Sequence, residues 1–178
     1  FDVSTSLGRN KVDYAVNNSL NRDMGADSPT EFKPGGYEFG HTVVNADVAN
    51  NFGDISLGLG TEFRLDNFVA LAGDEASYYN PTGSGAVQSF PGIQPQNAVN
   101  ESRSNIGFYG DAEYDVTDDL LVGAAARFEN YSDFGTSVTW KANGRYKMMD
   151  DNLSVRGSVS TGFRAPSLHQ MYMSNIQT

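Results

Sequence analysis

Acidic and aromatic side chains occur close together in one polar stretch of this sequence. The stretch contains the acids Asp74 and Glu75 and the tyrosines Tyr78 and Tyr79. Carboxylates beside aromatic rings can bind a cationic ligand, through charge and cation–π attraction, or a glycan. The same side chains could equally pack against one another within a loop, so both interpretations stay open at the level of sequence.

Two arginines, Arg127 and Arg164, are the other candidates for contact with a ligand. Each belongs to a segment of alternating polar and apolar residues and falls on its polar side. A guanidinium group presents its N–H donors in a fixed plane that suits carboxylate and phosphate groups. We predict that both arginines line a wet interior, where a ligand can reach them.

Metal chemistry and nucleophilic catalysis have little support in this sequence. It has no cysteine, and its two histidines, His41 and His169, have no partners at the spacing of metal ligands. The aspartate pairs at 118–119 and 150–151 suit tight turns, with calcium binding as the alternative. No serine lies in a nucleophile motif. We therefore expect no cofactor, no metal and no enzymatic activity.

The composition excludes two kinds of protein. Lys and Arg number 12 against 22 Asp and Glu, a net charge of −10, whereas nucleic-acid binding needs a basic face. No apolar run reaches the roughly 18 residues that a membrane-spanning helix requires. With 178 residues the chain has about the length of one domain, and no nucleic-acid partner is expected.

Alternation of polar and apolar residues is the dominant pattern and indicates β-strands. In the clearest run, Leu153, Val155 and Val159 alternate with Ser154 and Arg156. Successive side chains of a strand point to opposite faces, which gives this period of two. The pattern predicts seven strands at about 1–20, 41–51, 55–71, 103–116, 120–132, 137–148 and 153–164. We predict an all-β, antiparallel, up-and-down sheet.

The predicted connections are short at one end of the sheet and mostly long at the other. Tight turns rich in Asn, Asp and Gly lie at 51–54, 117–119 and 149–152, whereas long loops are expected at about 21–40 and 72–102. Loops of this length are uncommon in compact soluble domains. Short turns at one end and long loops at the other are typical of outer-membrane β-barrels.

Three further properties favour a membrane-spanning sheet over a soluble sandwich. The predicted strands reach or exceed the roughly 9–11 residues that cross a bilayer. The middle of the apolar face carries no charge, and aromatic residues gather near the strand ends, as in the girdles of such barrels. Those residues are Phe52, Tyr114 and Tyr146 towards the short turns, and Phe68, Phe128, Tyr131 and Trp140 towards the loops.

The charged face predicts a barrel larger than seven strands. A closed barrel of seven or eight strands has room inside only for its own side chains, and the polar face here carries many charges. We therefore expect a partial arc of about seven strands from a larger barrel. On that arc we predict that Trp140 faces lipid and Lys141 the lumen, and that Glu129 lies across from Lys141 beyond a tight hairpin at 133–136.

Two motifs in the last third of the chain resemble the barrel of TonB-dependent outer-membrane receptors. The segment Ser160–Leu168 reads STGFRAPSL, which is similar to the family's GFRAPS signature. The segment Val122–Gly135 reads VGAAARFENYSDFG and is similar to the hairpin that precedes it. The segment Asn100–Tyr109 also resembles the way in which these barrels resume after a long loop.

This resemblance implies a 22-stranded barrel filled by a plug domain, in the outer membrane of a Gram-negative bacterium. It implies uptake of a scarce ligand, such as a ferric siderophore, cobalamin or a glycan. The implied partners are the TonB energy-transducing complex, reached through a plug outside this sequence, outer-membrane lipid, and the small-molecule or glycan ligand. Arg164 lies within the signature, which could instead only shape the barrel wall against the plug.

Two other functions remain as alternatives at this stage. One is a passive, porin-like barrel without a plug, and the other is a secreted, soluble β-domain that binds carbohydrate. Both would show alternating strands. Residues 1–178 are expected to belong to the receptor barrel domain, with the loops at about 21–40 and 72–102 on its extracellular side.

Overall fold

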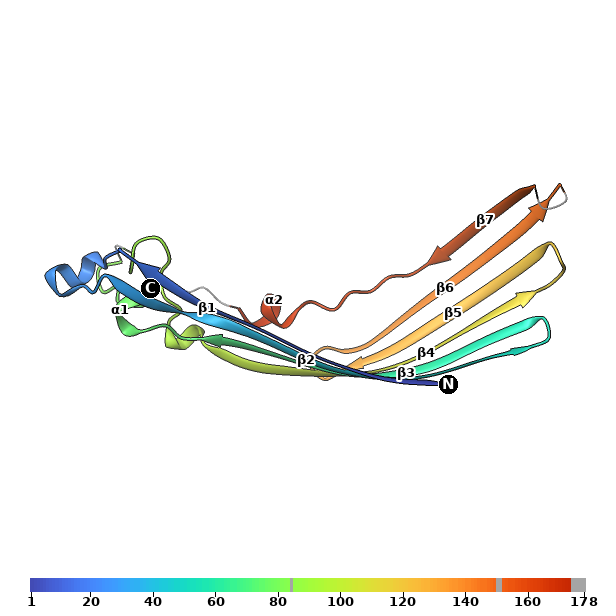
Figure 1. Ribbon diagram of the computed structural model, residues 1–178, viewed down its shortest axis with the longest axis horizontal. Helices are drawn as coiled ribbons and strands as arrows, with labels where there is room; N and C mark the ends of the chain where they lie inside the picture. Colours follow the sequence, from blue (N-terminus) through green and yellow to red (C-terminus); the bar gives the residue numbers. More distant parts are fainter. Residues whose placement is uncertain (84, 150–151, 174–178) are drawn as a thin grey trace. The chain divides into compact units, whose positions relative to one another are not determined.

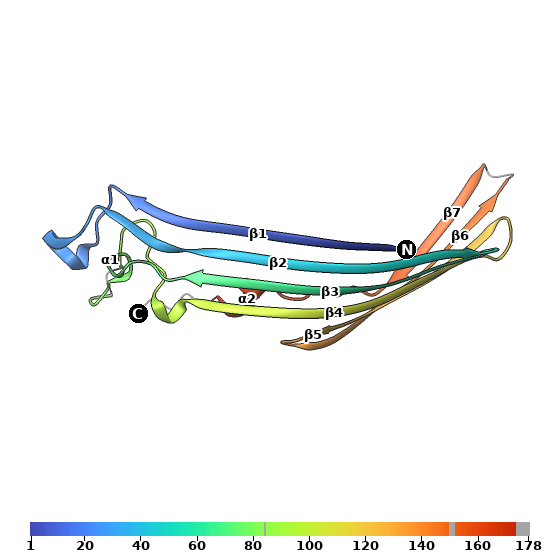
Figure 2. The same cartoon turned by 60° about the horizontal axis from the view of Figure 1, so that its bottom comes forward.

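The chain forms one antiparallel sheet of seven strands in a computed structural model that describes residues 1–83, 85–149 and 152–173. The strands pair in chain order, so the sheet is of the up-and-down type and is open (Figures 1 and 2). They are β1 (Asp2–Asn17), β2 (Glu31–Phe52), β3 (Ile55–Leu71), β4 (Val99–Asp115), β5 (Leu120–Tyr131), β6 (Gly135–Met148) and β7 (Leu153–Ser160). The predicted fold class and number of strands are confirmed.

Short helices occupy parts of the connections. The two α-helices are α1 (Glu75–Tyr78) and α2 (Leu168–Tyr172), and the two 3-10 helices are η1 (Arg22–Asp27) and η2 (Pro95–Asn97). Within the described part of the chain, no helix is both long and apolar enough to span a membrane.

Two compact units share the strands. Unit 1 comprises residues 1–6, 42–65 and 103–165, and unit 2 comprises residues 7–41, 66–102 and 166–178. Strands β5, β6 and β7 belong wholly to unit 1.

Strand register gives unit 1 one apolar and one polar face. Arg127 of β5 lies opposite Tyr109 of β4 and Thr139 of β6, while the neighbouring Ala126 lies opposite Trp140. Because paired residues point to the same side of a sheet, polar side chains align with polar ones across the three strands. The predicted placement of Trp140 and Lys141 on opposite faces is confirmed.

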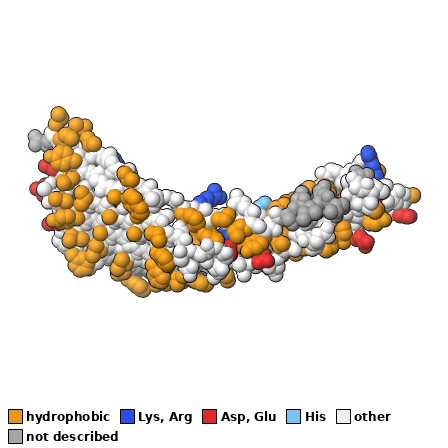
Figure 3. Space-filling model, turned by 180° about the vertical axis from the view of Figure 1, so that it is seen from behind, with side chains coloured by type: hydrophobic (Ala, Val, Ile, Leu, Met, Phe, Trp, Pro, Cys, Tyr) orange, Lys and Arg blue, Asp and Glu red, His pale blue; other side chains and the backbone are white. Residues whose placement is uncertain are grey.

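In unit 1, large apolar side chains are exposed and several polar or charged side chains are buried, which is the reverse of the usual arrangement in a soluble protein. Trp140 is 47% exposed and Val159 is 66% exposed, whereas Arg103 and Asn105 are 4% and 3% exposed. Space-filling shows hydrophobic side chains spread over this part of the molecule (Figure 3, left). The large apolar residues of β4–β7 that are exposed are Ile106, Phe108, Tyr114, Val122, Phe128, Val138, Trp140, Tyr146, Met148, Leu153, Val155 and Val159. A soluble monomer rarely exposes so large an apolar surface.

The apolar face has the extent needed to cross a bilayer. On β4 it runs from Ile106 to Tyr114, with Val116 just beyond the strand, close to the roughly 9–11 residues of a tilted membrane-spanning strand. Serines and asparagine occupy the same side of β4 before Ile106, at Ser104, Ser102 and Asn100. On β1, the exposed Leu7 is followed on the same side by Arg9.

The hairpin between β5 and β6 is tighter than predicted, so the predicted pair of Glu129 with Lys141 is wrong. Pairing continues to Tyr131 opposite Gly135, which leaves three residues in the turn. Gly135 has a φ of 94°, a conformation that such turns commonly assign to glycine. Glu129 therefore lies opposite Ser137, and Lys141 lies opposite Ala125, on the predicted face but displaced along the strand.

The loop predicted at 21–40 is shorter, because β2 begins at Glu31. The stretch around Pro34, Gly35 and Gly36 resembles a turn in sequence, yet it continues the strand. A β-carbon on Gly36 would overlap the carbonyl oxygen of Val12 in β1. Glycine here permits close approach of two backbones, which compensates for its low strand propensity.

Two further strand ends differ from prediction. β4 begins at Val99, so the loop predicted at 72–102 ends at residue 98 and contains α1 and η2. β7 ends at Ser160 rather than 164, since only Lys141–Met148 of β6 pair with it. Phe163 and Arg164 consequently lie beyond the strand, and the alternating pattern does not place them.

The core of unit 2 forms between the sheet and α2. Leu168 packs against Phe68 and Ala70 of β3, all three almost fully buried, with Tyr37, Val99 and Tyr172 around them. A capping box at Ser167 and Gln170 starts the helix. Phe68 was predicted in an aromatic girdle, and that prediction is wrong because Leu168 covers it.

Candidate functional site

The centre of the polar face in unit 1 is an ion cluster around Arg127. Its Nη2 atom lies 3.0 Å from Oε1 of Glu129 on β5 and 3.2 Å from Oε1 of Glu62 on β3. Arg64 approaches the same oxygen of Glu62 at 3.4 Å. Asn105 of β4 donates a hydrogen bond of 3.2 Å to Glu129. One guanidinium group therefore connects two strands on this face through paired acids.

Tyr109 extends this cluster towards β2. The guanidinium carbon of Arg127 lies 5.1 Å from the centre of the Tyr109 ring, within the range of a cation–π contact. The Tyr109 hydroxyl donates to the Asp47 carboxylate. Sequence alternation placed Tyr109 on the polar face, but nothing in the sequence singled it out as a neighbour of Arg127 from another strand.

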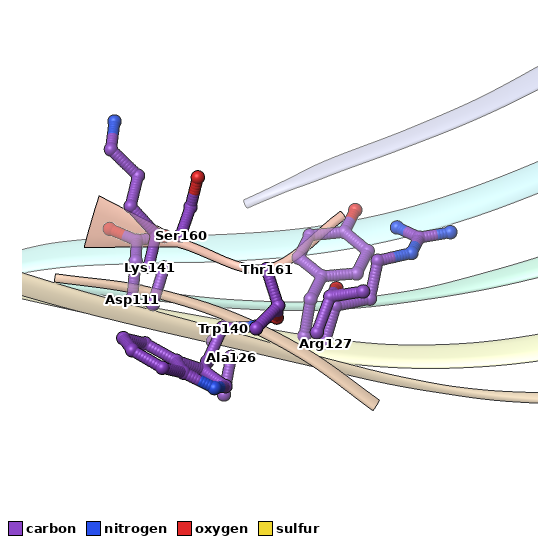
Figure 4. A pocket seen from close by; sticks show the side chains of 11 residues that line it. Asp111, Ala126, Arg127, Trp140, Lys141, Ser160 and Thr161 are labelled. Atoms are coloured by element: carbon purple, nitrogen blue, oxygen red, sulfur yellow. The ribbon is translucent and has the colours of Figure 1, made fainter. Parts of the chain in front are cut away.

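A hollow of about 380 Å³ opens beside this cluster. Its polar lining includes Asp111, Arg127, Thr139, Lys141 and Ser160. Figure 4 shows Lys141 and Ser160 pointing to one side of the sheet and Trp140 to the other. The hollow offers one carboxylate, two cations and hydroxyl groups, a set that can hydrogen-bond a polar solute.

The second predicted arginine, Arg164, is exposed and follows the end of β7. The segment around it is held by its neighbour Phe163, whose ring centre lies 5.7 Å from that of Phe134 and 6.2 Å from that of Tyr131. Tyr131 shares its face with Arg127 and lies opposite Asn105. Its predicted place in the outer girdle is therefore wrong.

The four candidate ligand contacts in the loop, at positions 74, 75, 78 and 79, belong to unit 2 and differ in how exposed their side chains are. Asp74 caps α1, since its carboxylate accepts hydrogen bonds from the backbone N–H groups of Ser77 (3.0 Å) and Lys33 (2.9 Å). Glu75 and Tyr79 are exposed. Tyr78 is half-buried. Asp74 thus positions the loop that carries the other three.

The histidines and aspartate pairs do not assemble a metal centre in the described chain. No group of three or more His, Cys, Asp or Glu side chains suited to a metal ion occurs there. His169 packs edge-on against Phe68 and Tyr37, and the His41 ring lies over Gly8. The pair at 118–119 lies in the turn before β5, and the pair at 150–151 lies outside the described residues.

An apolar band that faces outward, a charged opposite face and strands long enough for a bilayer define the wall of a transmembrane β-barrel. The chain belongs to one family of such proteins: the model for the TonB dependent receptor-like β-barrel matches residues 1–178. No curated protein and no solved structure shows a significant match to the chain. Membership makes it a bacterial outer-membrane receptor barrel with a role in transport, and the family is not one of enzymes.

Proposed function

We propose that this barrel takes up a scarce ligand of the ferric-siderophore, cobalamin or glycan class by energy-coupled transport. The observation that carries the proposal is the Arg127 cluster with its adjoining hollow, on the face opposite the apolar band. In a transmembrane barrel that face lines the interior. The charged and hydroxyl groups around the hollow can hydrogen-bond a polar solute in this interior.

We also propose an orientation for the sheet. The connections from β2 to β3, from β4 to β5 and from β6 to β7 would face the periplasm, and the loops at 18–30 and 72–98 would face outwards. A ligand would then first meet Glu75, Tyr78 and Tyr79, held in place by the cap at Asp74. Arg127 would contact it inside the barrel, and Arg164, beyond the end of β7, is a further proposed contact.

Energy coupling requires the TonB complex as a partner. Outer-membrane lipid is the second proposed partner, and it would surround the apolar band. A passive, porin-like barrel is the alternative that the test must separate. The soluble carbohydrate-binding domain is disfavoured, because it would leave the apolar band in water.

Uptake assays in cells test the proposal directly. Cells that express the receptor, with and without a functional TonB complex, receive an iron-labelled hydroxamate siderophore, labelled cobalamin or a labelled malto-oligosaccharide. We expect receptor-dependent uptake of one probe that disappears without TonB. Arg127→Gln should lower that uptake about tenfold through loss of charge-assisted hydrogen bonds. Lys11→Gln, at an exposed lysine outside the proposed contacts, is the control and should leave it unchanged. Uptake that persists without TonB would establish the passive alternative.

A further inference from the structure

Four basic side chains line the polar face of β6 and β7: Lys141, Arg145, Lys147 and Arg156. We call three of them, Lys141, Arg145 and Arg156, the basic strip. Arg145 lies directly opposite Arg156 in the antiparallel pair, and Lys141 lies opposite Ser160. Residues so placed have β-carbons about 4.5–5.5 Å apart, and like charges at this separation destabilise a sheet. The same face of β7 otherwise carries only serines, at 154, 158 and 160.

Among the residues that the structure describes, the basic strip differs from the other arginines of this face in forming no ion pair with an acid. Arg64, Arg103 and Arg127 each form an ion pair with Glu62, Asp133 or Glu129. Within residues 1–83, 85–149 and 152–173, no ion pair involves Lys141, Arg145 or Arg156, and all three side chains are exposed. Two adjacent guanidinium groups are thus left with their donors available.

Space for an occupant exists between these side chains. A second hollow, of about 360 Å³, is lined by all three residues of the basic strip together with Glu113, Asn143 and Ser158. Short side chains beside Arg156 leave room for a solute, and Asn143 and Ser158 add neutral hydrogen-bonding groups. Glu113 supplies the single carboxylate of this lining, against three cations.

We propose that the basic strip binds an oxyanion, a carboxylate or phosphate group, held between Arg145 and Arg156 with Lys141 at its edge. Such an anion would neutralise the repulsion across the strand pair, and it would match the planar donors of two guanidinium groups. The inference deepens the proposed function, on which it rests, by giving the ligand a negatively charged group. An acidic polypeptide segment seated on the strip is the competing explanation.

Calorimetric titration of the purified receptor in detergent tests this site without any uptake measurement. The two probes are inorganic phosphate and citrate, added at low salt because screening weakens attraction to exposed charges. We expect saturable binding of at least one probe, about tenfold weaker in Arg156→Gln, where a charge-assisted hydrogen bond is lost. The control Lys33→Gln removes a charge from outside the strip and should bind as the parent does.

A second variant keeps the test independent of folding defects. Arg156→Glu places an acid opposite Arg145, which replaces a repulsive pair with an attractive one, so the barrel should fold at least as well. Its binding of both probes should disappear, with the thermal unfolding temperature unchanged or raised. This combination assigns the effect to the anion site rather than to a damaged sheet.

The outcomes separate this site from the transport function. Binding that weakens in Arg156→Gln and disappears in Arg156→Glu establishes the site, even if all uptake assays fail. Stronger binding of citrate would indicate a carboxylate ligand, and stronger binding of phosphate a phosphorylated one. The proposal is overturned if neither probe binds the parent receptor, as expected where an acidic segment already covers the strip, or if all variants bind alike.

Discussion

Arg103 of β4 and Asp133 of the turn between β5 and β6 form an ion pair of 2.7 Å whose side chains are only 4% and 10% exposed. The Arg103 guanidinium also lies 5.2 Å from the Phe134 ring centre and 5.9 Å from that of Tyr131. The segment from Tyr131 to Gly135 therefore closes its own hairpin and attaches it to the neighbouring strand. This arrangement explains the residue types of the YSDFG motif.

Removal of either partner should destabilise the barrel strongly. We expect Asp133→Ala to lower the free energy of unfolding by about 3–5 kcal/mol, because the nearly buried Arg103 guanidinium loses its ion pair with this carboxylate. Urea unfolding in detergent measures this change, and the loss of heat-modifiable mobility on gels is the readout of unfolding. Asp13→Ala, which breaks the exposed pair of Asp13 with Lys11, is the control and should change little. Equal effects of the two variants would contradict the role assigned to the buried pair.

A second prediction concerns the close approach of β1 and β2. Gly36→Ala should destabilise the sheet by about 1–3 kcal/mol, because the new methyl group overlaps the Val12 carbonyl and forces the strands apart. Gly162→Ala is the matched control, since a β-carbon there meets nothing within 4 Å. Urea midpoints of the two variants provide the comparison. A midpoint for Gly36→Ala at or above that of Gly162→Ala would show that the backbones do not lie so close.

Sequence patterns predicted the part of each strand that carries an apolar face, and they failed beyond it. The seven strands and the opposed faces of Trp140 and Lys141 followed from alternation alone, because burial in lipid imposes a period of two. At Glu31–Gly40 both faces are mixed and glycine replaces larger residues, so no period remains to detect. The start of β2 was missed for this reason.

Contacts between distant segments were also beyond the reach of sequence patterns. The predicted pair of Glu129 with Lys141 depends on a hairpin turn at 133–136. The turn between β5 and β6 is tighter, and this moves the partner of Glu129 by several residues along β6, to Ser137. Phe68 is an aromatic residue near a strand end, as girdle residues are, but Leu168, far away in sequence, covers it. The same limit hid Tyr109 as a neighbour of Arg127, while Arg127 itself was found because charge on an alternating strand is conspicuous.

A third prediction concerns the packing of α2 in unit 2. Leu168→Ala should cost about 2–5 kcal/mol locally, since it removes a nearly buried leucine from contact with Phe68 and Ala70. Release of the helix would make the bond after Arg164 more accessible to trypsin. Limited proteolysis of the intact receptor measures the rate of this cleavage, with the exposed Met173→Ala as control. Indistinguishable cleavage rates would argue that α2 does not anchor this segment.

The central claim, that one face of the sheet contacts lipid and the other lines the barrel, is tested most directly by spin-label accessibility along β6. Single cysteines at each position from Ser137 to Lys147, in the receptor reconstituted into bilayers, carry the nitroxide label. Collisions with oxygen report lipid, and collisions with a water-soluble nickel complex report water. Our account predicts a period of two, with oxygen favoured at the even positions, such as Val138, Trp140 and Tyr146, and the nickel complex at Lys141 and Arg145. Accessibility without alternation, or with the two sets exchanged, would contradict it.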